Sequence, residues 1–316
     1  MRGIIPATIL AFIEQRTGKP IYKLFDLIAG TSTGGILALG LTRPDSNGQA
    51  ECSAQRLCEI YDQYIPQIFK NPQSWLGNLL RPKYTSFAFQ DILKEFFADY
   101  RLKDALIDVI VPCYDIEHRL PYVFRSRMAK LQAQDDFYMR DAVLAASASP
   151  TLFHPVRIPR KYKEGRYICL VDGGVFANNP SIYGYSEIKS LSNDESDEVL
   201  LVSIGTGRSN RSLSDEFISL WGYVQWSRPM LELVMESISE SIHEQIRPLL
   251  SKGSQRQYYR IQVELPESTN FAIDDASSKN MSILSQTADA FCPTSQDLAE
   301  LCDRLLSLSE TEAAIL

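Results

Sequence analysis

The residues most able to do chemistry lie in a short glycine-rich segment near the start of the chain. Gly30, Ser32 and Gly34 form a G-x-S-x-G pattern between a predicted strand and a predicted helix. In that setting the pattern is typical of a nucleophile elbow, a tight turn that exposes the serine hydroxyl at the end of a strand. The Thr33 N–H begins the helix, where free amides favour negative charge, so it is a candidate oxyanion donor. The alternative is a glycine turn in which Ser32 only caps the helix.

A serine hydroxyl is a weak nucleophile and needs a base nearby, for which Asp172 is the better candidate. Asp172 ends an apolar stretch and is followed by Gly173 and Gly174. Its carboxylate is therefore expected at the same sheet edge as Ser32, because side chains at strand ends converge there. An ordinary turn aspartate before glycine is the alternative. Among the histidines, only His154 is kept as a candidate base for a Ser-His pair.

Strands that end in glycine-rich turns, and the helices that cover them, must position these residues. Apolar stretches predict strands at residues 22–29, 105–114, 121–125, 167–171, 199–204 and 257–265. Helical composition and spacing predict helices at 4–15, 36–39, 53–69, 86–98, 141–148, 279–290 and 295–308, and one from Pro229 whose apolar stripe should face the core. This alternation favours a mostly parallel sheet with helices on both faces.

Composition excludes several classes of function. The chain has 316 residues, 39 acidic and 32 basic, and a net charge of −7, which is unsuited to binding the phosphate backbone of nucleic acid. Its six cysteines form no C-x-x-C pair, and its three histidines cannot build a zinc cluster, so we expect no metal site. We expect His118 and His243 to be solvated surface residues, and the chain to be cytoplasmic with reduced thiols. The length fits two domains or one large domain.

Four blocks together resemble the successive motifs of patatin-like phospholipases. The blocks are residues 25–35 (FDLIAGTSTGG), 145–153 (AASASPTLF), 172–180 (DGGVFANNP) and 202–207 (VSIGTG). Their order and spread make the resemblance far more specific than an isolated elbow, although it is loose after about residue 210. It implies a three-layer αβα sandwich over a single domain, residues 1–316, in which residues 210–316 supply a further helical and strand portion.

The resemblance also implies a reaction. Ser32 would be the nucleophile and Asp172 the base of a dyad without histidine, hydrolysing fatty-acyl esters of membrane glycerolipids, either phospholipids or galactolipids. The Ser32 hydroxyl would attack the ester carbonyl and form an acyl-enzyme. Water activated by Asp172 would then release the fatty acid. No metal or cofactor is required.

One part of the family pattern is incomplete in this chain. The family opens with a strand and a glycine-rich loop whose N–H groups form most of the oxyanion hole, and Met1-Arg2-Gly3 matches only the end of that loop. Arg2 and Gly3 are thus expected to join Thr33 at the oxyanion site. We expect that the start of the sequence is truncated and that an extended chain would hydrolyse lipid esters much faster. The alternatives are a catalytically weak or inactive lipid-binding or storage protein and an acyltransferase.

The implied substrate predicts peripheral contact with a membrane, for which the sequence offers three segments. Each segment also has an explanation that does not involve a membrane. The basic segment could be a solvated loop, and the aromatic segments could pack in the core. The basic segment contains Arg157, Arg160, Lys161, Lys163 and Arg166, and the two apolar segments contain Trp75, Leu76, Leu79 and Leu80, and Trp221, Tyr223 and Trp226. The sequence does not indicate an oligomeric state.

Overall fold

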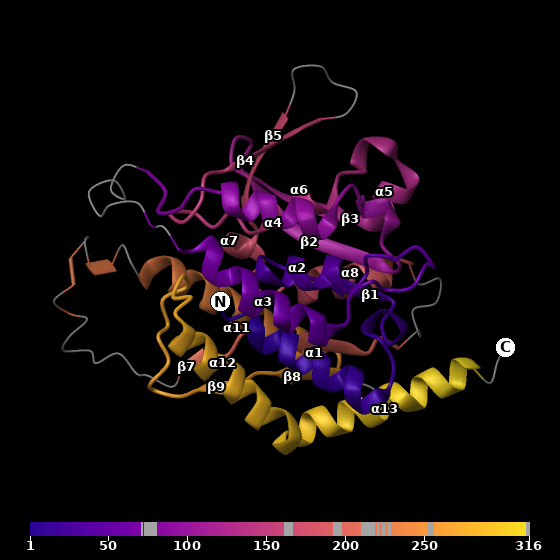
Figure 1. Cartoon of the computed structure of the whole chain (residues 1–316). Coiled ribbons are helices and arrows are strands. Elements are labelled where there is room, and N and C mark those ends of the chain that lie inside the picture. The colour runs from indigo at the N-terminus through magenta and orange to yellow at the C-terminus, as the bar shows by residue number, and fades with distance from the viewer. Residues whose placement is uncertain are drawn as a thin grey trace.

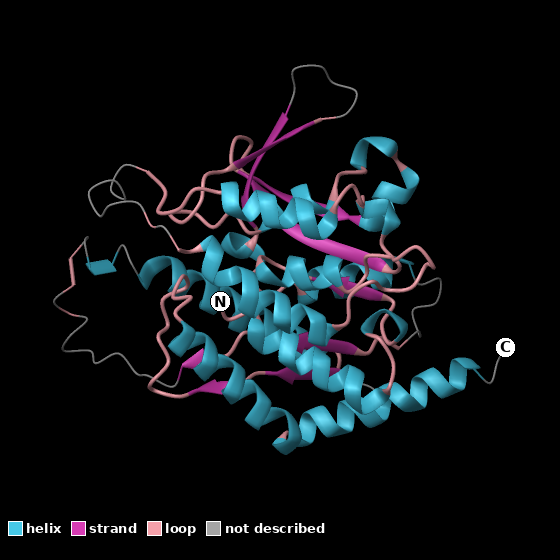
Figure 2. Ribbon diagram, viewed as in Figure 1, coloured by secondary structure: helices cyan, strands magenta, loops and turns pink. Residues whose placement is uncertain are grey.

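The protein folds into helices packed around small β-sheets (Figures 1 and 2). The computed structural model describes residues 1–70, 72, 81–160, 167–191, 198–209, 219, 221–222, 225–226, 229–251 and 256–313. Its strands are β1 (Leu27–Ala29), β2 (Asp108–Asp115), β3 (Leu120–Arg125), β4 (Val156–Pro159), β5 (Tyr167–Asp172), β6 (Leu201–Ile204), β7 (Arg208–Ser209), β8 (Tyr258–Ile261) and β9 (Glu264–Leu265). Its main helices are α1 (Ile4–Thr17), α2 (Thr33–Gly40), α3 (Ala54–Ile68), α4 (Phe87–Phe97), α5 (Ser126–Leu131), α6 (Met139–Ala146), α7 (Gly174–Ala177), α8 (Ser181–Leu191), α11 (Pro229–Leu249), α12 (Ser278–Phe291) and α13 (Gln296–Ala313).

The register of the five-stranded sheet brings two strand ends together. Ile110 of β2 pairs with Ala29 of β1 on one edge and with β3 on the other, and Cys113 pairs with Asp172 of β5 and again with β3. Because β3 occupies one edge of β2, both β1 and β5 must share the opposite edge. β1 runs parallel to β2 and β5 runs antiparallel to it, so β1 and β5 point toward each other. Their carboxyl ends therefore meet beside the middle of β2.

Two further pairings lie outside this sheet. β6 pairs with β8 in parallel, and β7 pairs with β9 in parallel. Among the described strands, β1 pairs only with β2 and β6 only with β8, so each has one edge without a strand partner. Both of these strands border the same cavity, described below.

The helices group around these strands in a broadly αβα arrangement, which confirms the expected fold class. α2 and α6 pack against β2, while α7, α8 and α11 pack together and contact β2, β1 and β6. α1 packs against α3, α12 and α13, so the two ends of the chain lie side by side, as the indigo and yellow helices of Figure 1 show. One continuous apolar core takes buried side chains from Ile4 in α1 to Leu305 in α13.

Strand pairing is more mixed than the sequence predicts. In the five-stranded sheet only the β1–β2 pair is parallel, and the β2–β3, β2–β5 and β4–β5 pairs are antiparallel. The link between β2 and β3 spans only residues 116–119, which is too short for the crossover that a parallel pair needs. The sequence pattern indicated the strands but not the direction in which each strand runs.

Candidate active site

The elbow places Ser32 between β1 and α2 in a strained backbone conformation. Ser32 has φ 55° and ψ −122°, a combination that residues with a side chain adopt rarely. The turn is tight because a Cβ on Gly30 would lie 2.1 Å from the Gly34 carbonyl oxygen. A Cβ on Gly34 would instead meet nothing within 4 Å. Of the two motif glycines, Gly30 is therefore the one that close packing requires.

Asp172 meets Ser32 across the gap between the two converging strands. The Ser32 hydroxyl donates a hydrogen bond to Asp172 Oδ2 at 2.7 Å, and the Gly174 N–H donates to Oδ1 at 2.8 Å. Both carboxylate oxygens are thus held in place. A Cβ on Gly173 would lie 2.3 Å from the Pro112 carbonyl oxygen, so this glycine lets the turn pass close to β2.

Burial sets the proton affinity of Asp172. Its side chain is 1% exposed, and the loss of water raises its pKa to about 6, against the opposing hydrogen bonds from Ser32 and Gly174. A carboxylate with a pKa near 6 is still mostly ionised at neutral pH, and it is a better proton acceptor than an exposed aspartate. The arrangement can therefore take a proton from the Ser32 hydroxyl.

The residues expected at the oxyanion site lie close to Ser32. Arg2, Gly3 and Thr33 line the same cavity as Ser32. Gly3 is packed so tightly that a Cβ there would lie 2.1 Å from Thr33 Oγ1 and 2.8 Å from the Tyr61 hydroxyl oxygen. Sequence reasoning did not single out Tyr61, which is buried in α3 and donates to the Thr33 carbonyl oxygen at 2.9 Å. Its position in an amphipathic helix gave no sign beyond that of a core residue.

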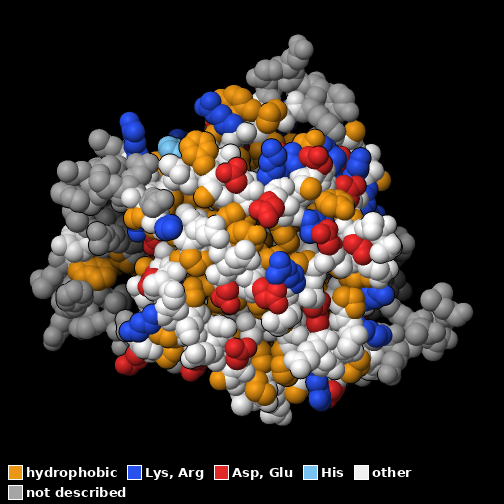
Figure 3. Space-filling model, viewed as in Figure 1, with side chains coloured by type: hydrophobic (Ala, Val, Ile, Leu, Met, Phe, Trp, Pro, Cys, Tyr) orange, Lys and Arg blue, Asp and Glu red, His pale blue; other side chains and the backbone are white. Residues whose placement is uncertain are grey.

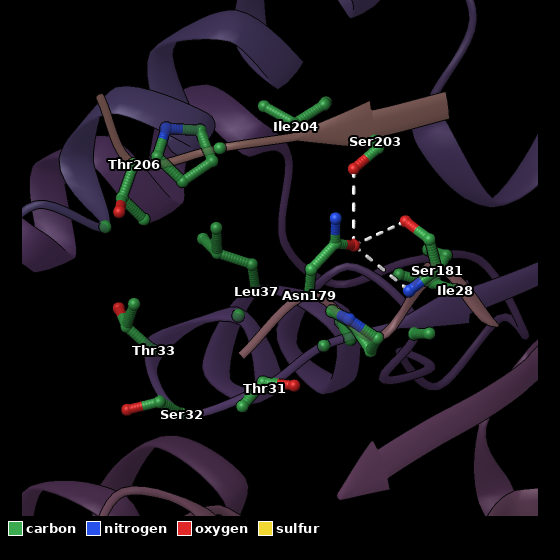
Figure 4. Close-up of a pocket in the computed structure, with 18 of the residues that line it drawn as sticks. Ile28, Thr31, Ser32, Thr33, Leu37, Asn179, Ser181, Ser203, Ile204 and Thr206 are labelled. Atoms are coloured by element: carbon green, nitrogen blue, oxygen red, sulfur yellow. Dashed lines mark hydrogen bonds between the residues drawn. The ribbon is translucent and has the colours of Figure 1, made fainter. Parts of the chain in front are cut away.

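A cavity of about 1120 Å³ is lined by Ser32 and Asp172, among other residues. Figure 4 shows Ser32 and Thr33 on one side of it and Ser203, Ile204 and Thr206 on another, with Leu37 and Asn179 between them. Its wall mixes apolar and polar groups. The apolar residues include Ile28, Leu37 and Ile204, and the polar residues include Thr31, Asn179, Ser181 and Ser203. Its volume suits a large, partly apolar ligand.

Two asparagines that sequence reasoning left without a role attach α11 to the turn that carries Asp172. Asn178 Nδ2 donates to the Met235 carbonyl oxygen at 3.0 Å, and Asn179 Nδ2 donates to the Ser239 carbonyl oxygen at 3.2 Å. α11 thus forms one wall of the cavity. The apolar stripe of α11 was expected to face the core, but it is only partly buried. Met235 and Ile246 are buried, whereas Val234 is 42% exposed.

None of the three histidines is paired with Ser32 in the described structure. His154 is exposed and is not among the residues that line the cavity. His118 is bonded to Asp115 with its side chain 63% exposed, and His243 is hydrogen-bonded to Tyr258. The Ser-His alternative for His154 therefore has no geometric support.

The segments considered for membrane contact are described only in part. Trp75, Leu76, Leu79, Leu80, Lys161, Lys163, Arg166 and Tyr223 lie outside the described residues. Of the remainder, the Arg157 guanidinium lies 4.7 Å from the centre of the Tyr167 ring, and Trp221 and Trp226 form an edge-on pair with centroids 5.2 Å apart. On the described atoms of the face in Figure 3, acidic and basic side chains are interspersed without an extended basic patch.

The described residues contain neither a cluster of metal-binding side chains nor a membrane-spanning helix. No group of three or more His, Cys, Asp or Glu side chains is arranged to hold a metal ion. None of the helices in this part of the chain is long and apolar enough to cross a bilayer.

This chain is similar to several known proteins. A family model described as patatin-like phospholipase matches residues 1–183. Patatin-like protein 2 of Oryza sativa subsp. indica is 30% identical over 318 residues, covering 89% of this chain and 78% of that protein. Patatin-like protein 1 of Arabidopsis thaliana is 29% identical over 92% of this chain and 78% of its own length.

The chain is also similar to a protein whose name marks it as inactive and to a protein of solved structure. A protein of Solanum tuberosum named probable inactive patatin-3-Kuras 1 is 30% identical over 92% of this chain and 83% of its own length. Among solved structures, VipD from Legionella pneumophila is similar with a TM-score of 0.36 and 12% identity, over 92% of this chain and 65% of that one.

Proposed function

Because the chain belongs to the patatin-like phospholipase family, as its sequence blocks predict, we propose that it hydrolyses fatty-acyl esters of membrane glycerolipids. Ser32 is the nucleophile and Asp172 is the general base. The observation that supports this proposal most directly is the 2.7 Å hydrogen bond from the strained Ser32 to Asp172. Nucleophile and base within hydrogen-bonding distance are the geometric requirement of covalent acyl transfer.

In the acylation step the Ser32 oxygen attacks the ester carbonyl carbon while its proton moves to Asp172 Oδ2. The carbonyl oxygen becomes negative and is stabilised by the N–H groups of Thr33 and Gly3. The bond from the carbonyl carbon to the glycerol oxygen then breaks, and that oxygen takes the proton from Asp172. The products are a lyso-lipid and an acyl group bound to Ser32.

In the deacylation step water replaces the departed alcohol. Asp172 takes a proton from the water, whose oxygen attacks the acyl carbon, and the Ser32 oxygen leaves and recovers the proton. The fatty acid is released and the dyad returns to its starting state. An alcohol in place of water would give acyl transfer, which product analysis distinguishes from hydrolysis.

The cavity has the properties that this substrate requires. Its apolar residues, such as Ile28, Leu37 and Ile204, can bury part of an acyl chain, and each buried methylene contributes about 0.8 kcal/mol. We propose that the chain acts peripherally at a membrane surface, where its substrate is concentrated.

A release assay tests the proposal. Phosphatidylcholine and galactolipid vesicles are incubated with the wild type, Ser32→Ala and Asp172→Asn, and free fatty acid is measured. We expect release by the wild type to fall by at least about 10³-fold in either variant, since removing a member of a catalytic unit disables it. Release at the same rate by Ser32→Ala would refute the dyad. Binding of lipid by the wild type without release would instead support the inactive lipid-binding alternative, for which one relative's name is a precedent.

A further inference from the structure

We propose that Tyr61 is a positioning residue that fixes Thr33, and with it the Thr33 N–H, beside the proposed nucleophile. The inference rests on the proposed function and adds to it a residue outside the sequence motifs. Tyr61 lies in α3, 28 positions after Thr33, and its side chain is 1% exposed. Its hydroxyl reaches across to the first residue of α2.

Two hydrogen bonds join the Tyr61 hydroxyl to Thr33, and their directions are determined. The phenol has one proton, which it donates to the Thr33 carbonyl oxygen at 2.9 Å. The Thr33 hydroxyl, which also contacts the phenol oxygen, must therefore be the donor of that second bond. Burial raises the pKa of Tyr61 well above its usual range, so the phenol keeps its proton at any working pH. Thr33 is thus held at both its carbonyl and its side chain.

The same ring limits the position of Gly3. A Cβ on Gly3 would lie 2.6 Å from Tyr61 Cε1 and 2.1 Å from Thr33 Oγ1, so backbone, ring and hydroxyl are in close contact. Gly3 and Thr33 are two of the three residues, with Arg2, expected at the oxyanion site. In the described structure neither the Gly3 N–H nor the Thr33 N–H has a hydrogen-bond acceptor. Tyr61 therefore contacts these two candidate donors while leaving their N–H groups free.

This arrangement matters because an oxyanion donor works only when it is preorganised. Donors must lie about 2.7–3.1 Å from the position where charge develops, and a displacement of a few tenths of an ångström weakens the interaction. Ser32 immediately precedes Thr33 and has a φ of 55°, so relaxation of the strained turn would rotate the Thr33 peptide. The Tyr61 hydroxyl holds the Thr33 side chain and the Thr33 carbonyl oxygen, which lies on the next peptide unit, and so restrains Thr33 against that rotation.

A purely structural role makes a different prediction. Buried tyrosines usually find some hydrogen-bond partner, and removing that partner normally costs stability without touching the reaction. Tyr259 is such a residue, since it is also 1% exposed and its hydroxyl donates to Glu300 at 2.7 Å. Its hydrogen bond goes to Glu300 of α13 and not to Thr33, so Tyr259→Phe is the matched control for Tyr61→Phe.

The test measures reaction of the full chain with a fluorophosphonate, in which the Ser32 oxygen would displace fluoride from phosphorus. We expect Tyr61→Phe to lower the labelling rate constant about tenfold. For hydrolysis of a soluble ester, kcat should also fall about tenfold while KM changes less than about twofold. The reason is that a displaced donor costs part of the ~10²-fold in rate that a lost donor costs. The fraction of protein finally labelled should stay at the wild-type value. Tyr259→Phe should leave rate constant, kcat and final fraction unchanged.

Several results would overturn the inference. An unchanged rate constant in Tyr61→Phe would do so, and so would a lower labelled fraction with an unchanged rate constant, which indicates partial unfolding. An equal fall in rate constant in Tyr259→Phe would also count against it. These outcomes leave the proposed function standing, whereas labelling that persists in Ser32→Ala would remove the proposed function itself.

Discussion

Asp172 is the residue whose environment most clearly serves a reaction. It is buried, accepts two hydrogen bonds and has no cation beside it in the described structure, so its charge is only partly compensated. Burial dominates and raises its pKa to about 6. A structural aspartate would be expected to pair with a basic side chain, as Asp136 does with Arg101. The uncompensated carboxylate is therefore better explained by a role in proton transfer.

The first prediction concerns the pH dependence of hydrolysis. Asp172 must be ionised to accept a proton from Ser32, and its pKa is raised to about 6. Activity should therefore rise tenfold per pH unit below about pH 6 and level off above it. The measurement is kcat/KM for a soluble ester between pH 4.5 and 8. A profile with no break between about pH 5 and 7 would contradict the assignment of Asp172 as the base.

The second prediction concerns stability. A raised pKa means that the folded state favours protonated Asp172, so its contribution to stability is present below the unfolded pKa of 3.8 and is lost as the pH rises through about 6. Asp172→Asn, which has the same shape without the charge, should be as stable as the wild type near pH 3.5. At pH 7 it should be more stable by on the order of 3 kcal/mol, the equivalent of two pKa units. Urea unfolding at both pH values measures this, and a variant less stable at pH 7 would contradict the account.

At the scale of single residues, sequence pattern predicted that Ser32 and Asp172 would lie together but not which residues support them. Ser32 and Asp172 stand in motifs whose residue types carry their chemistry. Tyr61, Asn178 and Asn179 act through contacts between segments far apart in the chain, and such contacts leave no trace in local spacing. Their roles could be recognised only once the fold placed them.

Ser32 and Asp172 are brought together by two short strands, β1 and β5, which run toward each other. β1 and β5 share one edge of β2 and run toward each other, so Ser32 and Asp172 meet at its middle. The expectation of a common sheet edge was right in its consequence but assumed parallel strands. Strand direction depends on pairing, which an apolar run does not encode.

The third prediction separates the two elbow glycines. Gly30→Ala would place a Cβ 2.1 Å from a backbone oxygen that cannot move freely, and should cost about 3 kcal/mol of stability. Gly34→Ala would meet no atom within 4 Å and removes a glycine from a helix, so it should gain about 0.5–1 kcal/mol. Chemical unfolding of both variants provides the comparison. Equal destabilisation would show that the tightness of the turn lies elsewhere.

Most of the main helices and strands were predicted within a few residues, but α5, α7 and α8 were not predicted. Two of the exceptions among the strands have physical causes. β4 was missed because Arg157 and Pro159 interrupt any apolar run, and it pairs only with β5. The strand expected at 22–29 is a helical turn at Ile21–Lys23 followed by β1. Composition alone could not distinguish a helical turn from a strand here, because short apolar stretches fit both.

At the scale of the whole molecule, the described C-terminal residues pack into the same apolar core as the N-terminal helix α1. β8 pairs with β6, and α12 and α13 pack against α1. We propose that the chain is one domain, although its sequence motifs end near residue 207. Apolar contacts between the two ends of the chain are not visible in any local pattern.

The fourth prediction tests this unity. A chain shortened to residues 1–209 loses the partner of β6 and the helices that cover α1, so it should show no cooperative thermal unfolding. The full chain should unfold in a single transition followed by circular dichroism. A cooperative transition of the fragment near the temperature of the full chain would show that residues 210–316 are a separate unit.

The central claim is that Ser32, activated by Asp172, forms a covalent intermediate, and peptide mass spectrometry after fluorophosphonate treatment tests it most directly. We expect one adduct, on the peptide containing Ser32, with formation slowed at least about 10²-fold in Asp172→Asn and absent in Ser32→Ala. A folded wild-type protein that gains no adduct, or that gains it at another residue, would contradict the account.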